Sequence, residues 1–211
     1  MLNYLPLIKL KHYYNPDFLS LKQKMKKTLI ICTAALLFAL NIFAQAKIPA
    51  IDKSPLDMAT YPVNYGLQKL QGKVTDPIAA RVLYSRPLKN NRVVFGELVE
   101  YNKVWRFGAN ENTEVEFFSD VTINNTKLKK GKYSIYAIPT TDKWTIIINK
   151  ELNSWGSYKY EQTQDAVRVD VPVQTSTEIA EAFYIYFDKA NTGFTLNAGW
   201  DNVKIALPIS M

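Results

Sequence analysis

The stretch DAVRVDVPV, residues 165–173, decides the fold, because apolar and polar side chains alternate along it. Val167, Val169, Val171 and Val173 face one way, and Arg168 and Asp170 lie between them. A period of two is typical of a β-strand with one buried face and one solvated face. The stretch therefore predicts a strand at the surface of a β-sheet protein.

The same alternation recurs along the chain on both sides of this stretch, at 133–138, 144–149, 183–187 and 203–207. Turn-forming residues separate the runs, and Asn124-Asn125 fits a tight hairpin because asparagine tolerates the positive φ that such turns require. About nine strands at this spacing, without a long amphipathic helical pattern, indicate a sandwich or barrel. We predict an all-β fold, with residues 47–211 forming a single antiparallel β-sandwich domain that is jelly-roll-like.

The first 46 residues have a different character and read as a precursor segment. Met25-Lys26-Lys27 is a short basic start, residues 28–43 are almost continuously apolar, and Ala44-Gln45-Ala46 is a small-x-small cleavage pattern. The apolar run is shorter than the about 20 residues of a membrane span. We predict a cleaved signal peptide at 25–46, an over-extended start at 1–24, and export to the periplasm, cell envelope or extracellular space. The mature chain is expected to have no transmembrane segment.

Cleavage after Ala46 changes what chemistry is open to the chain. Six of its 26 Lys and Arg residues and one of its 19 acidic residues precede Lys47, so the net charge falls from +7 to +2. A net charge of +2 gives no electrostatic reason to expect a nucleic-acid partner. The cut also removes His12 and Cys32, the only histidine and cysteine. Catalytic triads that need His or Cys, and His- or Cys-ligated metal sites, are thereby excluded. We predict no cofactor and no metal.

Residues 82–170 resemble the bacterial family called domain of unknown function 2911. The resemblance rests on a series of short motifs in order: Tyr84-Ser85-Arg86-Pro87, Phe95-Gly96-Glu97-Leu98-Val99, Val104-Trp105-Arg106-Phe107-Gly108-Ala109-Asn110-Glu111, Gly131-Lys132-Tyr133-Ser134, Ile138-Pro139, Trp144-Thr145, Asn149-Lys150, Trp155-Gly156 and Tyr158 through Tyr160. One departure is Phe107, where a smaller polar residue is expected. The resemblance implies a secreted or cell-envelope bacterial protein and assigns no activity.

The segment from Trp105 to Asn112 is the best candidate site. It is too irregular for a strand and lacks helical periodicity, so it is expected to be a connection that gathers an indole, a guanidinium, an amide and a carboxylate. Such groups suit a small polar ligand or glycan, because an aromatic face covers apolar sugar surface while polar groups bind hydroxyls. The candidate ligand-binding residues are Arg86, Trp105, Arg106, Asn110, Glu111 and Trp155. The competing interpretation is a structural knot of paired polar groups that closes the end of the sandwich.

Two other functions stay open at this point. A carboxylate-dependent glycan hydrolase would pair Glu111 with Glu97, Glu114 or Glu116, since two carboxylates suffice for glycoside hydrolysis. Glu114 and Glu116, however, alternate with Val115 and Phe117, which is the pattern of a solvated strand face. A purely structural module would instead use an exposed strand edge or tyrosine face to bind a partner protein. The leading hypothesis is non-catalytic binding, with no catalytic residue assigned.

Overall fold

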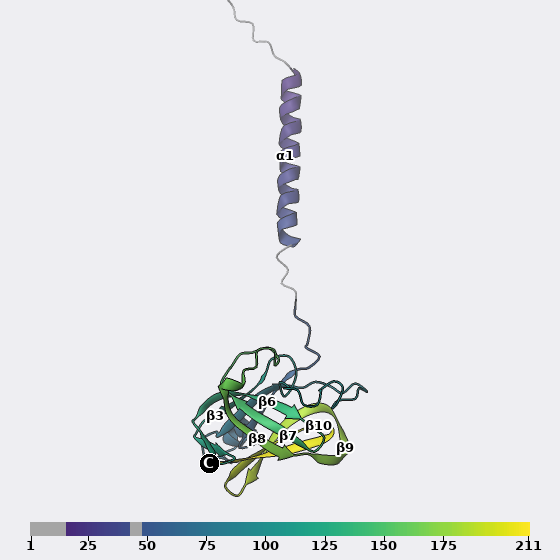
Figure 1. Ribbon diagram of the computed structural model, residues 1–211. Coiled ribbons are helices and arrows are strands. Elements are labelled where there is room, and N and C mark those ends of the chain that lie inside the picture. Colours follow the sequence, from purple (N-terminus) through teal and green to yellow (C-terminus); the bar gives the residue numbers. More distant parts are fainter. Residues whose placement is uncertain (1–15, 43–47) are drawn as a thin grey trace, which may run out of the picture. The chain divides into compact units, whose positions relative to one another are not determined.

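The computed structural model describes residues 16–42 and 48–211, and the chain divides into two compact units, Met1–Ala50 and Ile51–Met211. The first unit contains helix α1 (Pro16–Ile42), which includes Met25 and an exposed Cys32 (Figure 1). A search of residues 16–42 and 48–211 finds no helix with the length and apolar character needed to cross a membrane. His12 and the expected cleavage site at Ala44-Gln45-Ala46 lie outside the described residues, so the signal peptide stays a prediction.

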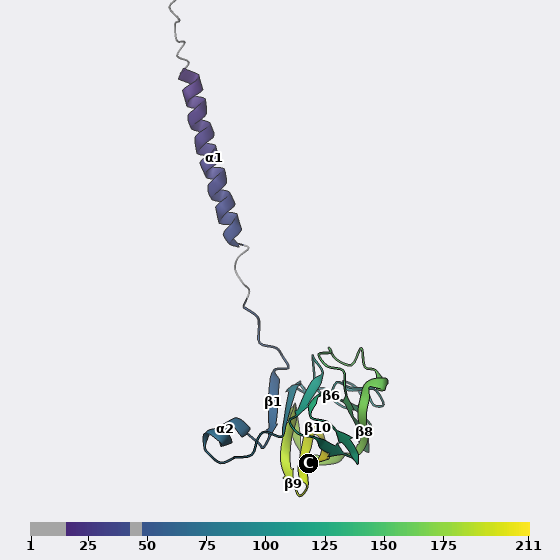
Figure 2. The same cartoon turned by 90° about the vertical axis from the view of Figure 1, so that its left-hand side faces the viewer.

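The second unit is built from two antiparallel sheets. The larger sheet has the order β1-β2-β3-β6-β7-β8, and its strands are Leu56–Tyr61, Ala80–Ser85, Thr113–Phe117, Gly131–Pro139, Lys143–Asn149 and Asp165–Pro172. The smaller sheet has the order β5-β4-β10-β9, with strands Thr126–Leu128, Val121–Ile123, Gly193–Ser210 and Gln174–Ala190. A short helix α2 (Tyr65–Leu70) lies beside β1, and a 3₁₀ turn η1 (Gln162–Gln164) precedes β8 (Figure 2).

The alternation in the sequence explains which face of each strand is buried. In β8, Val167 and Val171 are buried while Arg168 and Asp170 are exposed. The hairpin at Asn124-Asn125 is confirmed: it joins β4 to β5, and both asparagines have positive φ values of 45° and 63°. The pattern of period two thus sets the sheet faces, and asparagine supplies the turn.

The core lies between the two sheets and is rich in aromatic rings. Tyr61 of β1 stacks on Phe194 of β10 with ring centroids 4.7 Å apart, and the Tyr84 hydroxyl donates across to the Ile185 carbonyl at 3.2 Å. Trp144 and Trp200 are almost completely buried in the same cluster. Fully burying one large apolar side chain stabilises a fold by about 1.5–3 kcal/mol, so this core holds the sheets together.

The predicted all-β sandwich is confirmed. The larger sheet follows the chain order, except that the β4–β5 hairpin, which lies between β3 and β6 in the sequence, belongs to the smaller sheet. The chain passes from one sheet to the other between β3 and β4, between β5 and β6, and between β8 and β9. The long loops of the larger sheet, between β2 and β3 and between β7 and β8, are the ones that carry the candidate site.

Candidate functional site

A pocket of about 570 Å³ lies on the outer face of the larger sheet, where β1, β2 and β3 adjoin. Its floor comes from Leu83 and Ser85 of β2 and Glu114 of β3. Leu83 and Glu114 are direct cross-strand partners, and both alternate with buried core residues, so they point away from the core. The strand period therefore leaves these side chains available to line a cavity.

One wall of the pocket is a segment of the β7–β8 loop, residues 151–156, which pairs with residues 110–114. Residues 110–112 of that partner segment form the second wall. The Asn112 N–H donates to the Ser154 carbonyl at 3.0 Å, and the Gly156 N–H donates to the Asn110 carbonyl at 2.9 Å. The Glu114 carboxylate accepts the Asn153 N–H at 3.0 Å. These bonds hold Asn153 and Trp155 against the pocket, which both of them line.

Asn112 connects this wall to the sheet beneath. Its side chain is buried, its Oδ1 accepts the Ser154 N–H at 2.9 Å, and its Nδ2 donates to the Ser134 hydroxyl of β6. Ser134 in turn donates to the Glu151 carbonyl, and the Ser154 hydroxyl donates to the Glu151 carboxylate at 3.0 Å. Buried polar groups that are fully paired rigidify their surroundings. Asn112 therefore positions the Trp155 wall.

A third wall comes from the segment that precedes β1. The Asn110 amide donates to Asp52 Oδ1 at 2.9 Å, and the Ser54 N–H donates to the same oxygen at 2.6 Å. These two hydrogen bonds, the one from Ser54 above all, lower the pKa of Asp52, because both stabilise the ionised carboxylate. Asp52 is consequently charged at neutral pH.

The pocket lining contains one exposed aromatic ring, and all of its charged side chains are negative. Trp155 is 59% exposed, whereas every other tryptophan is at most 8% exposed. Asp52, Glu111 and Glu114 supply carboxylates, Asn110, Asn112 and Asn153 supply amides, and no lysine or arginine is found among the described residues that line the pocket. An exposed indole beside directional polar groups is chemistry that suits a hydroxylated ring.

Residues 67–209 match the model of the family described as "Protein of unknown function (DUF2911)". The chain belongs to this family. No curated protein and no solved structure matches the chain. The DUF2911 match includes β2 to β9 and most of β10, so it contains the pocket floor and two of its walls; Asp52, Ser54 and Leu56 of the third wall precede it.

Within the DUF2911 domain, the pocket brings together three of the six residues that the sequence singled out. Asn110, Glu111 and Trp155 line it, and Glu111 and Trp155 form an isolated backbone bridge between the two walls. The expectation that residues 105–112 form a connection is also met, since they lie between β2 and β3 outside any strand. Asn110 has a φ of 58°, a conformation that asparagine adopts readily.

The other three predicted residues lie elsewhere. Trp105 is buried in the core, where its indole donates to the Gly108 carbonyl at 3.1 Å, and it does not line the pocket. Arg86 donates to Asp57 at 3.0 Å and to the Phe183 carbonyl at 3.1 Å, and the second of these bonds connects it to β9 of the smaller sheet. Arg106 is half-buried beside Gly156, and its Nε finds no hydrogen-bond partner among the described residues.

Of the carboxylates that the hydrolase hypothesis would use, some line the pocket and others do not. Glu111 and Glu114 line the pocket, whereas Glu97 does not. Glu116 forms an ion pair with Arg81 on the outer face of β2 and β3. Of the pairs considered from the sequence, only Glu111 with Glu114 shares a cavity. Within the described part of the chain, no group of three His, Cys, Asp or Glu side chains is arranged to hold a metal ion.

Sequence reasoning missed Asp52, Ser85 and Asn153 as pocket residues. Asp52 and Asn153 come from segments that lie far from residues 105–112 in sequence, and long-range hydrogen bonds with the side chains of Asn110 and Glu114 bring them to the pocket. A signal for Ser85 was present in the sequence, because it lies two residues after Leu83 and strand alternation places both on the same face of β2.

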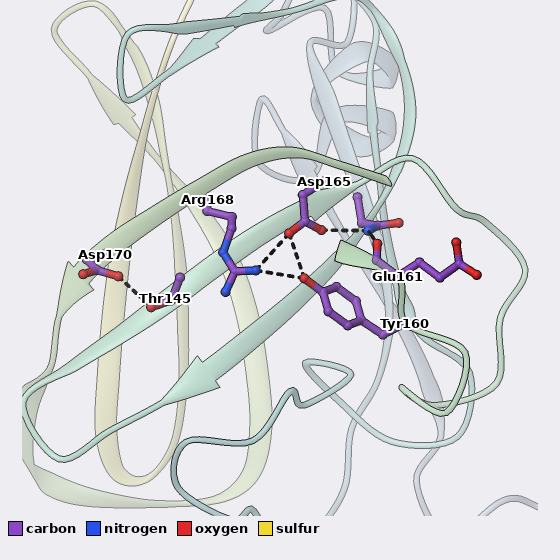
Figure 3. Close-up of polar contacts among 7 residues, drawn as sticks. Thr145, Tyr160, Glu161, Asp165, Arg168 and Asp170 are labelled. Atoms are coloured by element: carbon purple, nitrogen blue, oxygen red, sulfur yellow. Dashed lines mark hydrogen bonds and ion pairs between the residues drawn. The ribbon is translucent and has the colours of Figure 1, made fainter. Parts of the chain in front are cut away.

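The far end of the β7–β8 loop is fixed by a second polar cluster. Figure 3 shows the Arg168 guanidinium beside both Tyr160 and Asp165. Arg168 donates to the Tyr160 hydroxyl and to the Asp165 carboxylate, each at 3.0 Å, and Tyr160 donates to Asp165 at 2.7 Å. Burial, together with the hydrogen bond to Asp165, raises the pKa of Tyr160 to about 12. The loop is thus anchored at both ends, by Asn112 and by Tyr160.

Proposed function

We propose that this DUF2911 protein is an exported, non-catalytic β-sandwich that binds a glycan or another small hydroxylated ligand in the pocket beside Trp155. The observation that carries the proposal is the exposed ring of Trp155 in a cavity whose lining also offers amides, carboxylates and hydroxyl groups beside Leu56 and Leu83. The indole stacks on the apolar face of a sugar ring, and the polar groups bind its hydroxyls directionally.

The size and construction of the pocket support the proposal. A volume of about 570 Å³ falls within the range of small-molecule sites, about 300–1,000 Å³. The Trp155 wall is held by backbone hydrogen bonds to residues 110–114 and by buried Asn112. Little ordering is therefore left to occur on binding, and that preorganisation favours affinity.

Export is supported by the sequence. The basic start at Met25-Lys26-Lys27, the apolar run after it and Ala44-Gln45-Ala46 together make a signal-peptide pattern. A glycan-binding domain placed outside the cytoplasm would meet the polysaccharides of the envelope or the surroundings.

A glycan-array screen of the purified protein tests the function. We expect retention on a subset of glycans that is lost in Trp155→Ala and weakened in Glu111→Gln. Tyr158→Ala is the matched control, because Tyr158 is an exposed aromatic residue of the same loop that does not line the pocket. Equal retention by wild type and Trp155→Ala would refute this site.

Glycan hydrolysis is the second candidate, and the observation that favours it is that Glu111 and Glu114 share the pocket. Hydrolysis requires one carboxylate to act as a general acid and the other as a nucleophile or base. An assay for new reducing ends distinguishes binding from hydrolysis. The protein is incubated with array-positive oligosaccharides before the assay. Binding without products supports the non-catalytic function, and products that disappear in both Glu111→Gln and Glu114→Gln support the hydrolase.

A further inference from the structure

The three carboxylates that line the pocket form no ion pair with a lysine or arginine among the described residues. Among the described residues, ion pairs with lysine or arginine are formed by Asp57, Glu116, Asp120, Asp165, Asp170 and Asp201. Within residues 16–42 and 48–211, Asp52 and Glu114 accept hydrogen bonds only from neutral groups, and Glu111 takes part in no ion pair. The pocket therefore carries negative charge that the described residues do not neutralise.

A serine hydroxyl in the same pocket points independently to a ligand. Ser85 is 3% exposed and lines the pocket, and the alternation along β2 places its side chain on the same face as Leu83. Its hydroxyl makes no hydrogen bond to another described residue. The hydroxyl oxygen is accessible from the pocket, because it is not among the buried polar atoms that lack a partner, so a ligand atom can form a hydrogen bond with it.

Trp155 adds an attraction that depends on ligand charge. The face of an indole carries negative electrostatic potential, and tryptophan is the best of the aromatic residues at binding cations. With Trp155 on one wall and Glu111 and Glu114 adjoining it, a cation in the pocket meets both a ring face and carboxylates. The same carboxylates and ring face would repel an anionic ligand.

We propose that the ligand is a hydroxylated ring that carries a protonated amine, that is, an amino sugar or an oligomer of amino sugars. This inference rests on the proposed function and narrows it to one chemical class. The ammonium group lies among the carboxylates of Asp52, Glu111 and Glu114, the apolar face of the ring stacks on Trp155, and a ring hydroxyl pairs with Ser85. A neutral sugar fulfils the last two interactions and not the first.

Three oligosaccharides that share one backbone test this class. β-1,4-linked oligomers of glucosamine, N-acetylglucosamine and glucose, equal in length, differ only in the substituent at C2. Calorimetric titrations at about pH 5.5 and low salt leave the amine of the glucosamine oligomer protonated and its charge little screened. We expect the glucosamine oligomer to bind about tenfold or more tightly than the other two, and its advantage to shrink as salt is added.

The outcomes separate this inference from the proposed function. If the neutral oligomers bind as tightly as the glucosamine oligomer, the protein binds glycans and the charge assignment is wrong. If no oligomer binds and the glycan array is also empty, the proposed function itself fails. Preference for the glucosamine oligomer at low salt supports both.

Charge-removing variants tie the preference to the pocket. In Glu114→Gln the side-chain oxygen still accepts the Asn153 N–H, so the wall is retained while the charge is lost. We expect Glu111→Gln and Glu114→Gln each to weaken binding of the glucosamine oligomer by about three- to tenfold, with little effect on the glucose oligomer. Glu97→Gln, outside the pocket, is the matched control. Unchanged affinity in both pocket variants would overturn the inference.

Discussion

Trp155 and Trp105 show that the same residue type has two separate roles in this domain. Trp105 is 8% exposed and contacts the rings of Trp144, Phe183 and Trp200, with centroids 5.8, 5.2 and 6.3 Å away. Trp155 has most of its surface in solvent. The first therefore contributes to stability, and the second is available for binding.

The contrast predicts opposite effects of truncation. Trp105→Ala removes a buried indole from a close-packed cluster, and we expect the free energy of unfolding to fall by about 3–5 kcal/mol. Trp155→Ala removes an exposed ring, and we expect a change within about 0.5 kcal/mol. Urea denaturation of both variants and the wild type measures this. A large loss of stability in Trp155→Ala would contradict the assignment of its side chain to binding.

At the scale of elements, the pocket depends on the loop between β7 and β8 more than on any strand. Residues 151–156 pair with residues 110–114, and Tyr160, Asp165 and Arg168 anchor the other end of the loop (Figure 3). Strands β2 and β3 only supply the floor. A change that releases the loop should thus abolish the site while the sandwich stays folded.

We expect substitution of Asn112 to release the loop. Asn112→Ala leaves the Ser154 N–H and the Ser134 hydroxyl without their buried partner, so the free energy of unfolding should fall by about 1–3 kcal/mol. Faster amide hydrogen exchange confined to residues 151–156 would show that the loop is loosened. Asn197→Ala is the control, because the Asn197 amide donates a hydrogen bond to Asp188 at the surface. Exchange rates equal to those of the wild type would argue against a positioning role.

The anchor at Tyr160 predicts a loss of stability in alkali. The pKa of Tyr160 is raised to about 12 in the folded chain, from an ordinary value near 10. Because the folded chain holds this proton more tightly, the contribution is complete below pH 10 and is lost as the pH rises toward 12. Denaturation across this range should show a smaller decline in Tyr160→Phe than in the wild type. Parallel declines would mean that Tyr160 titrates normally.

Strand faces were predictable from the sequence and loop directions were not. In β8, Val167 and Arg168 are assigned to opposite faces by strand period alone. No period governs residues 105–112, where Trp105 turns into the core and Glu111 toward solvent. Asp52 reaches the pocket through a hydrogen bond to Asn110 across a long sequence separation. Such contacts arise from tertiary packing, which one sequence does not display.

For the whole molecule, the predicted cleavage of a signal peptide would decide which side chains are available for chemistry. Cleavage after Ala46 would leave a chain without histidine or cysteine, because His12 and Cys32 are the only ones. We expect Edman sequencing or mass spectrometry of protein recovered from the producing cells to give Lys47 as the first residue. Recovery of a chain that still contains Cys32 would disprove this processing.

The distribution of tryptophans also provides the most direct test of ligand binding by the pocket. Trp105, Trp144 and Trp200 are buried, so a ligand that stacks on the open indole alters the fluorescence of Trp155. Titration of the protein with an array-positive glycan should give a saturable change in tryptophan emission that is absent in Trp155→Phe, together with weaker binding of that variant by calorimetry. Calorimetric binding of equal affinity in the wild type and Trp155→Phe, with no change in emission in either, would contradict the account.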